Sequence, residues 1–141
     1  MMKFMLILCL LTYVSAFVKL KQVPQIHRLR AIIEIKSDLE FEKFILKASD
    51  RPVVVDFQNS KCKPCIRAAP IYQALSEKYK DKVNFYKVDS DAWKDSLALM
   101  KANGVKSIPT FQIWVNGVKT ESIQGVHLDE VEQKLVDNKL V

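Results

Sequence analysis

Two cysteines separated by two residues, Cys62 and Cys65, offer the clearest chemistry in this 141-residue sequence. On a helix they would lie about one turn apart, a spacing that suits a disulfide. The first would face solvent at the helix N-terminus, where free N–H groups and the helix dipole favour a thiolate. Asp56 precedes them in an otherwise uncharged run. We therefore expect a redox site with Cys62 as nucleophile, Cys65 as resolving thiol and Asp56, if buried, as their proton-exchange partner.

A zinc site is the alternative use of a C-x-x-C pair, because two cysteines supply half of a tetrahedral ligand set. The sequence has no second pair of this kind, and His27 and His127 are isolated. Cys9 lies in an apolar N-terminal run. We therefore expect no metal ion and no other cofactor.

Strand and helix signals alternate through residues 31–141, and they define the elements that must position the cysteines. The β-branched run at 53–55 predicts a strand that is buried on both faces. The polar segment 58–61 leads from it into a helix expected over 62–79. Pro70 lies inside that helix and implies a kink, because proline lacks an N–H and crowds the preceding turn.

The other elements follow from hydrophobic periodicity and from capping and turn residues. We expect strands over 31–35 and 83–88, a helix capped by Ser37 and Glu40, a helix over 91–102, strands 110–115 and 118–123 joined at Asn116-Gly117, and a last helix capped near Asp129. The expected apolar sides of the first and last helices consist of Leu39, Phe41, Phe44, Ile45 and Ala48, and of Leu128, Val131, Leu135 and Val136.

The positive charge of the chain is concentrated at its N-terminus. The chain has 22 lysines and arginines against 16 acidic residues, a net charge of +6. Five of the basic residues precede residue 31 and no acidic residue precedes Glu34, which leaves 17 against 16, or +1, for residues 31–141. A nucleic-acid-binding domain needs a basic face, so we expect no nucleic-acid partner.

Residues 1–16 have the pattern of a secretory signal peptide. Lys3 provides a short positive region, an apolar run follows at 4–11, and small residues occupy 14–16. We expect cleavage after Ala16 and a secreted, extracellular protein. The run is shorter than a transmembrane span of about 20 residues, so we expect no stable membrane insertion. A hydrophobic N-terminal strand and an uncleaved anchor are the alternatives.

Residues 17–30 form a basic N-terminal extension without hydrophobic periodicity. We interpret it as a solvated extension of the domain at 31–141. Electrostatic attachment to acidic glycans or to an anionic membrane surface is the functional alternative. Its basic residues are Lys19, Lys21, Arg28 and Arg30.

The predicted order β-α-β-α-β-α-β-β-α, with a C-x-P-C motif opening the second helix, resembles the thioredoxin family over residues 31–141. The resemblance implies an α/β thioredoxin fold, with a mixed five-stranded sheet flanked by helices on both faces. The matching motifs are V-V-V-D-F at 53–57, Ala69-Pro70, Lys87 in F-Y-K-V-D, Ile108-Pro109-Thr110, Asn116-Gly117 and Gly125.

The resemblance also implies roles for residues outside the C-x-x-C motif. Pro109 would be a cis-proline against the two sulfurs, and the backbone at Ile108 would pair with substrate. Lys87 would lie near Asp56, although a surface lysine at a strand end is an equal alternative. Asp56 itself has the alternative of a hydrogen-bonded core acid. Within the motif, we expect Pro64 to fix the helix start, where its missing N–H costs nothing.

Several positions depart from the usual family pattern. Lys61 stands where tryptophan is usual, Lys63 where glycine is usual, and Gln58 where an aromatic residue is usual. Both lysines would add positive charge beside Cys62 and contact substrate, together with Pro64 and Ile108. We expect Trp114 in the core and Trp93 at the surface.

We therefore predict a secreted thiol–disulfide oxidoreductase that reduces or exchanges protein disulfides. Its partners would be disulfide-containing proteins and a thioredoxin reductase or another thiol donor, and we expect a monomer. The alternative is an extracellular thioredoxin-like binding or signalling module with incidental redox turnover. We favour the enzyme because Cys62, Cys65, Asp56 and Pro109 occur together, and a binding module needs no such combination.

Overall fold

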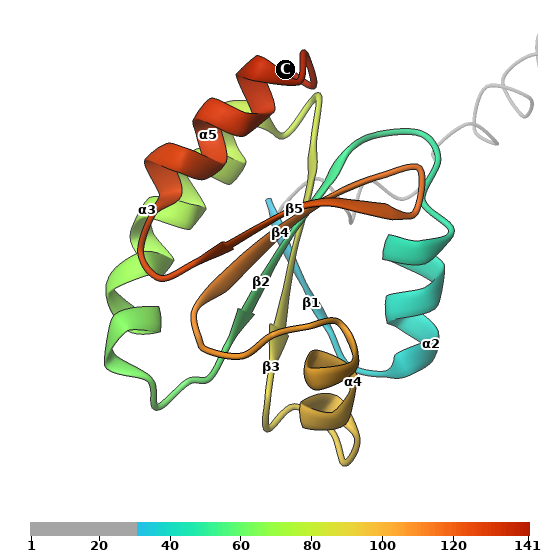
Figure 1. Cartoon of the computed structure of the whole chain (residues 1–141), viewed down its shortest axis with the longest axis vertical. Coiled ribbons are helices and arrows are strands. Elements are labelled where there is room, and N and C mark those ends of the chain that lie inside the picture. Colours follow the sequence, from blue (N-terminus) through green and yellow to red (C-terminus); the bar gives the residue numbers. More distant parts are fainter. Residues whose placement is uncertain (1–30) are drawn as a thin grey trace, which may run out of the picture. The chain divides into compact units, whose positions relative to one another are not determined.

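The structure is a computed structural model that describes residues 31–141, which form a mixed five-stranded sheet with strand order β1-β3-β2-β4-β5 (Figure 1). The predicted α/β class and the order of strands and helices along the chain are confirmed. The elements are β1 (Ile32–Ile35), α2 (Asp38–Phe41), the π-helical turn η3 (Glu42–Leu46), β2 (Val53–Gln58), α3 (Lys63–Tyr79), β3 (Asn84–Asp89), α4 (Ser96–Ala102), β4 (Thr110–Val115), β5 (Val118–Gln124) and α5 (Leu128–Asp137).

The signal peptide predicted at 1–16 and the basic extension predicted at 17–30 lie outside the described residues. Within residues 31–141, no helix combines the length and the apolar character that a membrane crossing requires.

Strand β2 lies at the centre of the sheet, parallel to β3 and antiparallel to β4. Its three valines are fully buried, as predicted. Val54 packs into the core beneath α3 and α5, whereas Val53 and Val55 pack into the core on the other face. A strand with helices over both of its faces needs such a continuous apolar run.

Helices cover both faces of the sheet, with α3 and α5 on one side and α2 and α4 on the other (Figure 1). On the α3 side, Tyr72 and Phe85 form an edge-to-face pair with 5.6 Å between the ring centroids. On the opposite side, Phe41 contacts Trp114 in an edge-to-face pair at 6.0 Å. Trp114 is therefore a core residue, as predicted.

The first helical segment corrects one predicted core position. Its cap is as expected, because the Ser37 hydroxyl accepts a hydrogen bond from the Glu40 N–H at 3.2 Å. Phe41 and Ile45 are buried, but Leu39 is 77 % exposed. Positions two residues apart lie about 200° apart around a helix, so Leu39 points away from the core that Phe41 enters.

Helix α4 begins at Ser96, five residues later than the start we predicted at position 91. The Ser96 hydroxyl donates to the carbonyls of Ser90 and Trp93, and the Asp91 N–H donates to the Asp89 carboxylate. Side chains therefore pair with backbone N–H and carbonyl groups that an α-helix starting at position 91 would use for its own hydrogen bonds. Trp93 is also not a free surface residue, because it packs on the α2-side core and its indole N–H donates to the Asp38 carboxylate.

The last helix corrects its predicted cap. α5 begins at Leu128, with His127 at the N-cap position and without a side-chain capping bond. Asp129 and Glu130 lie in the first turn, where negative charge interacts favourably with the helix dipole.

The hairpin between β4 and β5 turns at Asn116-Gly117, as predicted, and both residues have positive φ. Gly117 is also packed against the backbone carbonyl of Leu46 at the end of η3, so a Cβ at this position would overlap that carbonyl. Gly104 has nearly the same φ, +77° against +76°, but a Cβ there would only make van der Waals contact with the end of Lys119. An alanine at either position would be strained by the positive φ, but only at Gly117 would its Cβ also overlap a neighbouring backbone atom.

Gly117→Ala should lower the free energy of unfolding by at least about 2 kcal/mol more than Gly104→Ala, measured by denaturant titration. Gly104→Ala should itself cost only about 1–2 kcal/mol, the cost of a left-handed backbone at a residue with a Cβ. Equal losses for the two variants would contradict the close packing of the hairpin on η3.

Candidate active site

The two cysteines lie at the start of α3 and form a disulfide with a Cα–Cα distance of 5.2 Å. Cys62 occupies the N-cap position with an extended backbone, and its Sγ accepts a hydrogen bond from the Cys65 N–H at 3.3 Å. Pro64 lies in the first turn, where helices have unpaired N–H groups in any case. Cys62 Sγ therefore lies at the N-terminus of a 17-residue helix, where the free backbone N–H groups are.

The two sulfurs differ in exposure. Cys65 is 1 % exposed, because it faces the sheet from the first turn of α3. Cys62 is half-buried, and its neighbours Lys61 and Lys63 are exposed. A substrate can therefore approach Cys62 but not Cys65.

Ile108 and Pro109, which are distant in sequence, lie beside the disulfide. The bond between them is cis, as the resemblance implied, and the Ile108 carbonyl oxygen lies 3.9 Å from Cys62 Sγ. Pro109 is buried, and its carbonyl accepts a hydrogen bond from the Gly125 N–H at 2.8 Å. This contact joins the proline loop, which lies beside Cys62, to the residue that follows β5.

Asp56 is buried in β2, with 3 % of its surface exposed. It follows Val54 by two residues and therefore faces α3 from the sheet. Its Oδ1 atom has no hydrogen-bond partner among the described residues. Burial raises the pKa of Asp56 from 3.8 to about 7, and the charge of Lys87 lowers it in part. A carboxyl group with this pKa can hold or release a proton near neutral pH.

The sequence left open whether Lys87 lies near Asp56 or at the surface, and the structure shows that it does both. It lies opposite Asp56 in the register of β2 and β3, and its charge acts on that carboxyl. It also lies opposite Glu34 in β1, and its ammonium forms an ion pair with the Glu34 carboxylate at 3.6 Å. Lys87 is therefore a half-exposed lysine in a row of three charged residues across adjacent strands.

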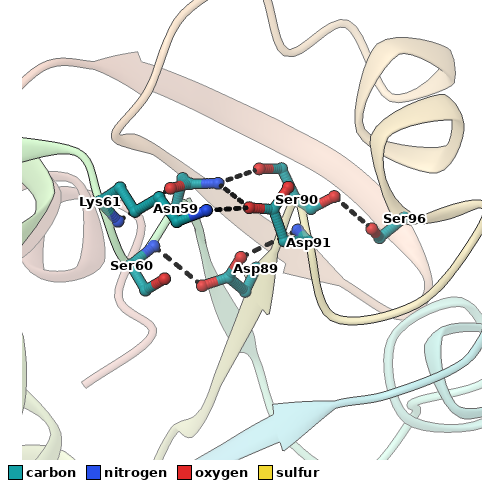
Figure 2. Close-up of polar contacts among 7 residues, drawn as sticks. All are labelled: Asn59, Ser60, Lys61, Asp89, Ser90, Asp91 and Ser96. Atoms are coloured by element: carbon teal, nitrogen blue, oxygen red, sulfur yellow. Dashed lines mark hydrogen bonds and ion pairs between the residues drawn. The ribbon is translucent and has the colours of Figure 1, made fainter.

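The loop before Cys62 is held by side chains of the loop after β3, and Figure 2 shows these contacts. The Asn59 amide donates to Ser90 Oγ at 2.7 Å and to Asp91 Oδ2 at 3.0 Å. The Ser60 N–H donates to the Asp89 carboxylate at 2.9 Å. We call these contacts between residues 59–61 and 89–91 the loop clasp. None of these five residues was predicted as a site residue from the sequence, because only the fold brings the two loops together.

The charge of Lys61 is partly offset by this same loop. Its ammonium lies 3.9 Å from Asp91 Oδ2 (Figure 2). The two side chains are 86 % and 59 % exposed, so the pair is weak and screened. The expectation that Lys61 adds positive charge beside Cys62 therefore needs correction for Asp91. Among residues 31–141, Lys63 forms no ion pair.

The same residues contain no group of three or more side chains that could bind a metal ion.

A family model for thioredoxin matches residues 32–137, about three quarters of the chain. The chain belongs to the thioredoxin family. A thioredoxin H-type from Chlamydomonas reinhardtii is 35 % identical over 104 residues, covering 72 % of this chain and 89 % of that protein. Thioredoxin from Oryctolagus cuniculus is 37 % identical over 99 residues, covering 70 % and 90 %. A reduced thioredoxin pre-protein from Schistosoma mansoni has a similar structure, with a TM-score of 0.68 at 32 % identity, covering 78 % and 98 %.

These comparisons, together with the paired cysteines, identify the fold as the thioredoxin fold and the activity as thiol–disulfide oxidoreductase. The cysteine pair thus fits the C-x-x-C active site of the thioredoxin family, here with the sequence C-K-P-C.

The raised pKa of Asp56 predicts a pH-dependent effect of Asp56→Asn. The unfolded chain ionises this residue near pH 4, whereas the folded chain retains the proton to about pH 7. Between these values the folded state binds more protons, so the stability of the native protein falls as the pH rises. The variant lacks this titration. Its stability relative to the native chain should therefore rise by about 2–4 kcal/mol from pH 4 to pH 8.

Denaturant unfolding of the oxidised chains at several pH values measures this difference. Asp81→Asn is a suitable control, because Asp81 is exposed in the turn after α3. A stability difference between Asp56→Asn and the native chain that does not change with pH would contradict the raised pKa.

Proposed function

We propose that the chain is a secreted reductase of protein disulfides, in which Cys62 attacks the substrate and Cys65 resolves the mixed disulfide. The observation that carries this assignment is the difference in exposure between the two sulfurs. The Cys65 N–H also points at Cys62 Sγ, which favours a thiolate on Cys62 once the disulfide is open.

The proposed reaction has two exchange steps. The Cys62 thiolate attacks one sulfur of a substrate disulfide, which forms a mixed disulfide and releases the other substrate sulfur as a thiolate. The Asp56 carboxylate then takes the proton of Cys65, directly or through water, and the Cys65 thiolate attacks Cys62 Sγ. The second substrate sulfur leaves, and the Cys62–Cys65 disulfide closes. Two electrons pass to the substrate, so a thioredoxin reductase or another thiol donor must reduce the chain again.

The surface around Cys62 supports binding of an extended substrate segment. The Ile108 backbone lies beside Cys62 Sγ, where it can pair with the substrate main chain. Lys61, Lys63 and Pro64 flank the same sulfur from the loop and the first turn of α3. We propose these four residues as the substrate-contacting set, and a monomer as the active species.

The two serine variants should fail at different steps. Cys62→Ser should lose reduction of insulin disulfides by about a hundredfold or more, because no nucleophile remains. Cys65→Ser should instead accumulate a substrate-linked adduct on Cys62, because no resolving thiol is present. Mass spectrometry of the trapped species locates the bond. An adduct on Cys65 in the Cys62→Ser variant would reverse the assignment, and a partner interaction that survives loss of both cysteines would favour a binding module.

Secretion is proposed from the n-, h- and c-region pattern of residues 1–16. The mature protein should appear outside the producing cell and begin at Phe17. N-terminal sequencing of the exported material measures this directly. Protein that remains in the cytosol with Met1 or Met2 intact would contradict both the signal peptide and the extracellular site of action, while the oxidoreductase activity would be unaffected.

A further inference from the structure

The segment immediately before Cys62 makes more side-chain hydrogen bonds than the rest of the site, and none of these side chains transfers a proton or an electron. Asn59 is the centre of this arrangement (Figure 2). Its amide nitrogen donates to Ser90 and Asp91, and its amide oxygen accepts from the Lys61 N–H at 2.8 Å. All the polar atoms of one half-buried side chain are therefore used to hold one loop.

We infer that Asn59 is a positioning residue, which through the loop clasp holds Cys62 in its helix-capping geometry when the Cys62–Cys65 disulfide is open. The connection runs through the backbone. The Asn59 carbonyl accepts a hydrogen bond from the Cys62 N–H at 3.1 Å, so a fixed Asn59 fixes the residue that carries the nucleophile.

The clasp matters more in the dithiol state than in the disulfide state. In the disulfide state the covalent bond to Cys65 itself holds Cys62. Once that bond opens, the backbone of Cys62 is held by its N–H bond to Asn59 and by the Ile66 N–H, which donates to the Cys62 carbonyl at 3.0 Å. Only the first of these contacts depends on the loop, and the loop depends on the clasp.

The consequence is thermodynamic as well as geometric. A correctly placed Cys62 thiolate accepts the Cys65 N–H and the other free N–H groups of α3. The Cys65 N–H also contacts this sulfur in the disulfide, but the bond to a charged thiolate is stronger, so these contacts stabilise the reduced form more than the oxidised form. A loop that moves loses part of this stabilisation. Loss of the clasp should therefore shift the equilibrium with glutathione toward the disulfide, and it should slow the attack by Cys62.

Asn59→Ala tests this without a change in charge. The dithiol–disulfide equilibrium constant should shift about three- to tenfold toward the disulfide, and kcat/KM for insulin reduction should fall by a similar factor. Asn138→Ala is a matched control, because Asn138 is an exposed asparagine at the end of α5. It should change neither quantity.

A reciprocal exchange tests the contact itself. In Asn59→Asp/Asp91→Asn the amide at position 91 can donate to the carboxylate at 59, and the net charge equals that of the native chain. This double variant should recover the equilibrium constant to within about twofold, as expected for a pair that couples through direct contact. Asn59→Asp alone places two carboxylates together and should be at least as impaired as Asn59→Ala.

Denaturant unfolding of both redox forms separates positioning from plain structural support. We expect Asn59→Ala to destabilise the dithiol form more than the disulfide form. Equal losses of stability in the two forms, with an unchanged glutathione equilibrium, would overturn the proposal. So would a double variant that remains as impaired as Asn59→Asp alone.

Discussion

The structure depends most on the burial of one ionisable group in the central strand. β2 has neighbours on both edges and helices over both faces, so a side chain from it has little access to water. At Asp56 this position holds a carboxyl group whose Oδ1 lacks a partner among the described residues. Ionisation there costs free energy, and the raised pKa expresses that cost. The same burial that opposes folding at high pH gives this carboxyl group, on the α3 side of the sheet, a pKa close to neutrality.

The chemistry then follows from how separate segments converge on the end of α3. The helix start gives Cys62 its N–H groups, the cis-proline loop places the Ile108 carbonyl beside the same sulfur, and the loop clasp holds the approach from β2. Cys65 is buried in the first turn of α3. One sulfur is thus accessible to a substrate and the other is not, which is the difference that our proposal of sequential disulfide exchange requires.

The sequence predicted those features that local pattern determines. The valine run of β2, the C-x-P-C motif at the start of α3 and the Asn116-Gly117 turn each have a short-range cause, and the cis bond at Pro109 came from resemblance to a family. The errors had two kinds of cause. α4 starts late because of local competition, in which the Ser96 hydroxyl and the Asp91 N–H bond within residues 89–96 instead of within a helix. Asn59 was missed because its partners Ser90 and Asp91 are more than thirty positions away.

The most direct test of this account is a ¹³C NMR titration of the Asp56 carboxyl carbon in the oxidised chain. The carboxyl shift reports the protonation of this one group and does not depend on turnover, substrate or stability. The account predicts a midpoint near pH 7, in agreement with a pKa of about 7 for a buried carboxyl beside Lys87. A midpoint near pH 4, the ordinary value of an exposed aspartate, would contradict it, because Asp56 would then be solvated and could not serve as the proton acceptor for Cys65.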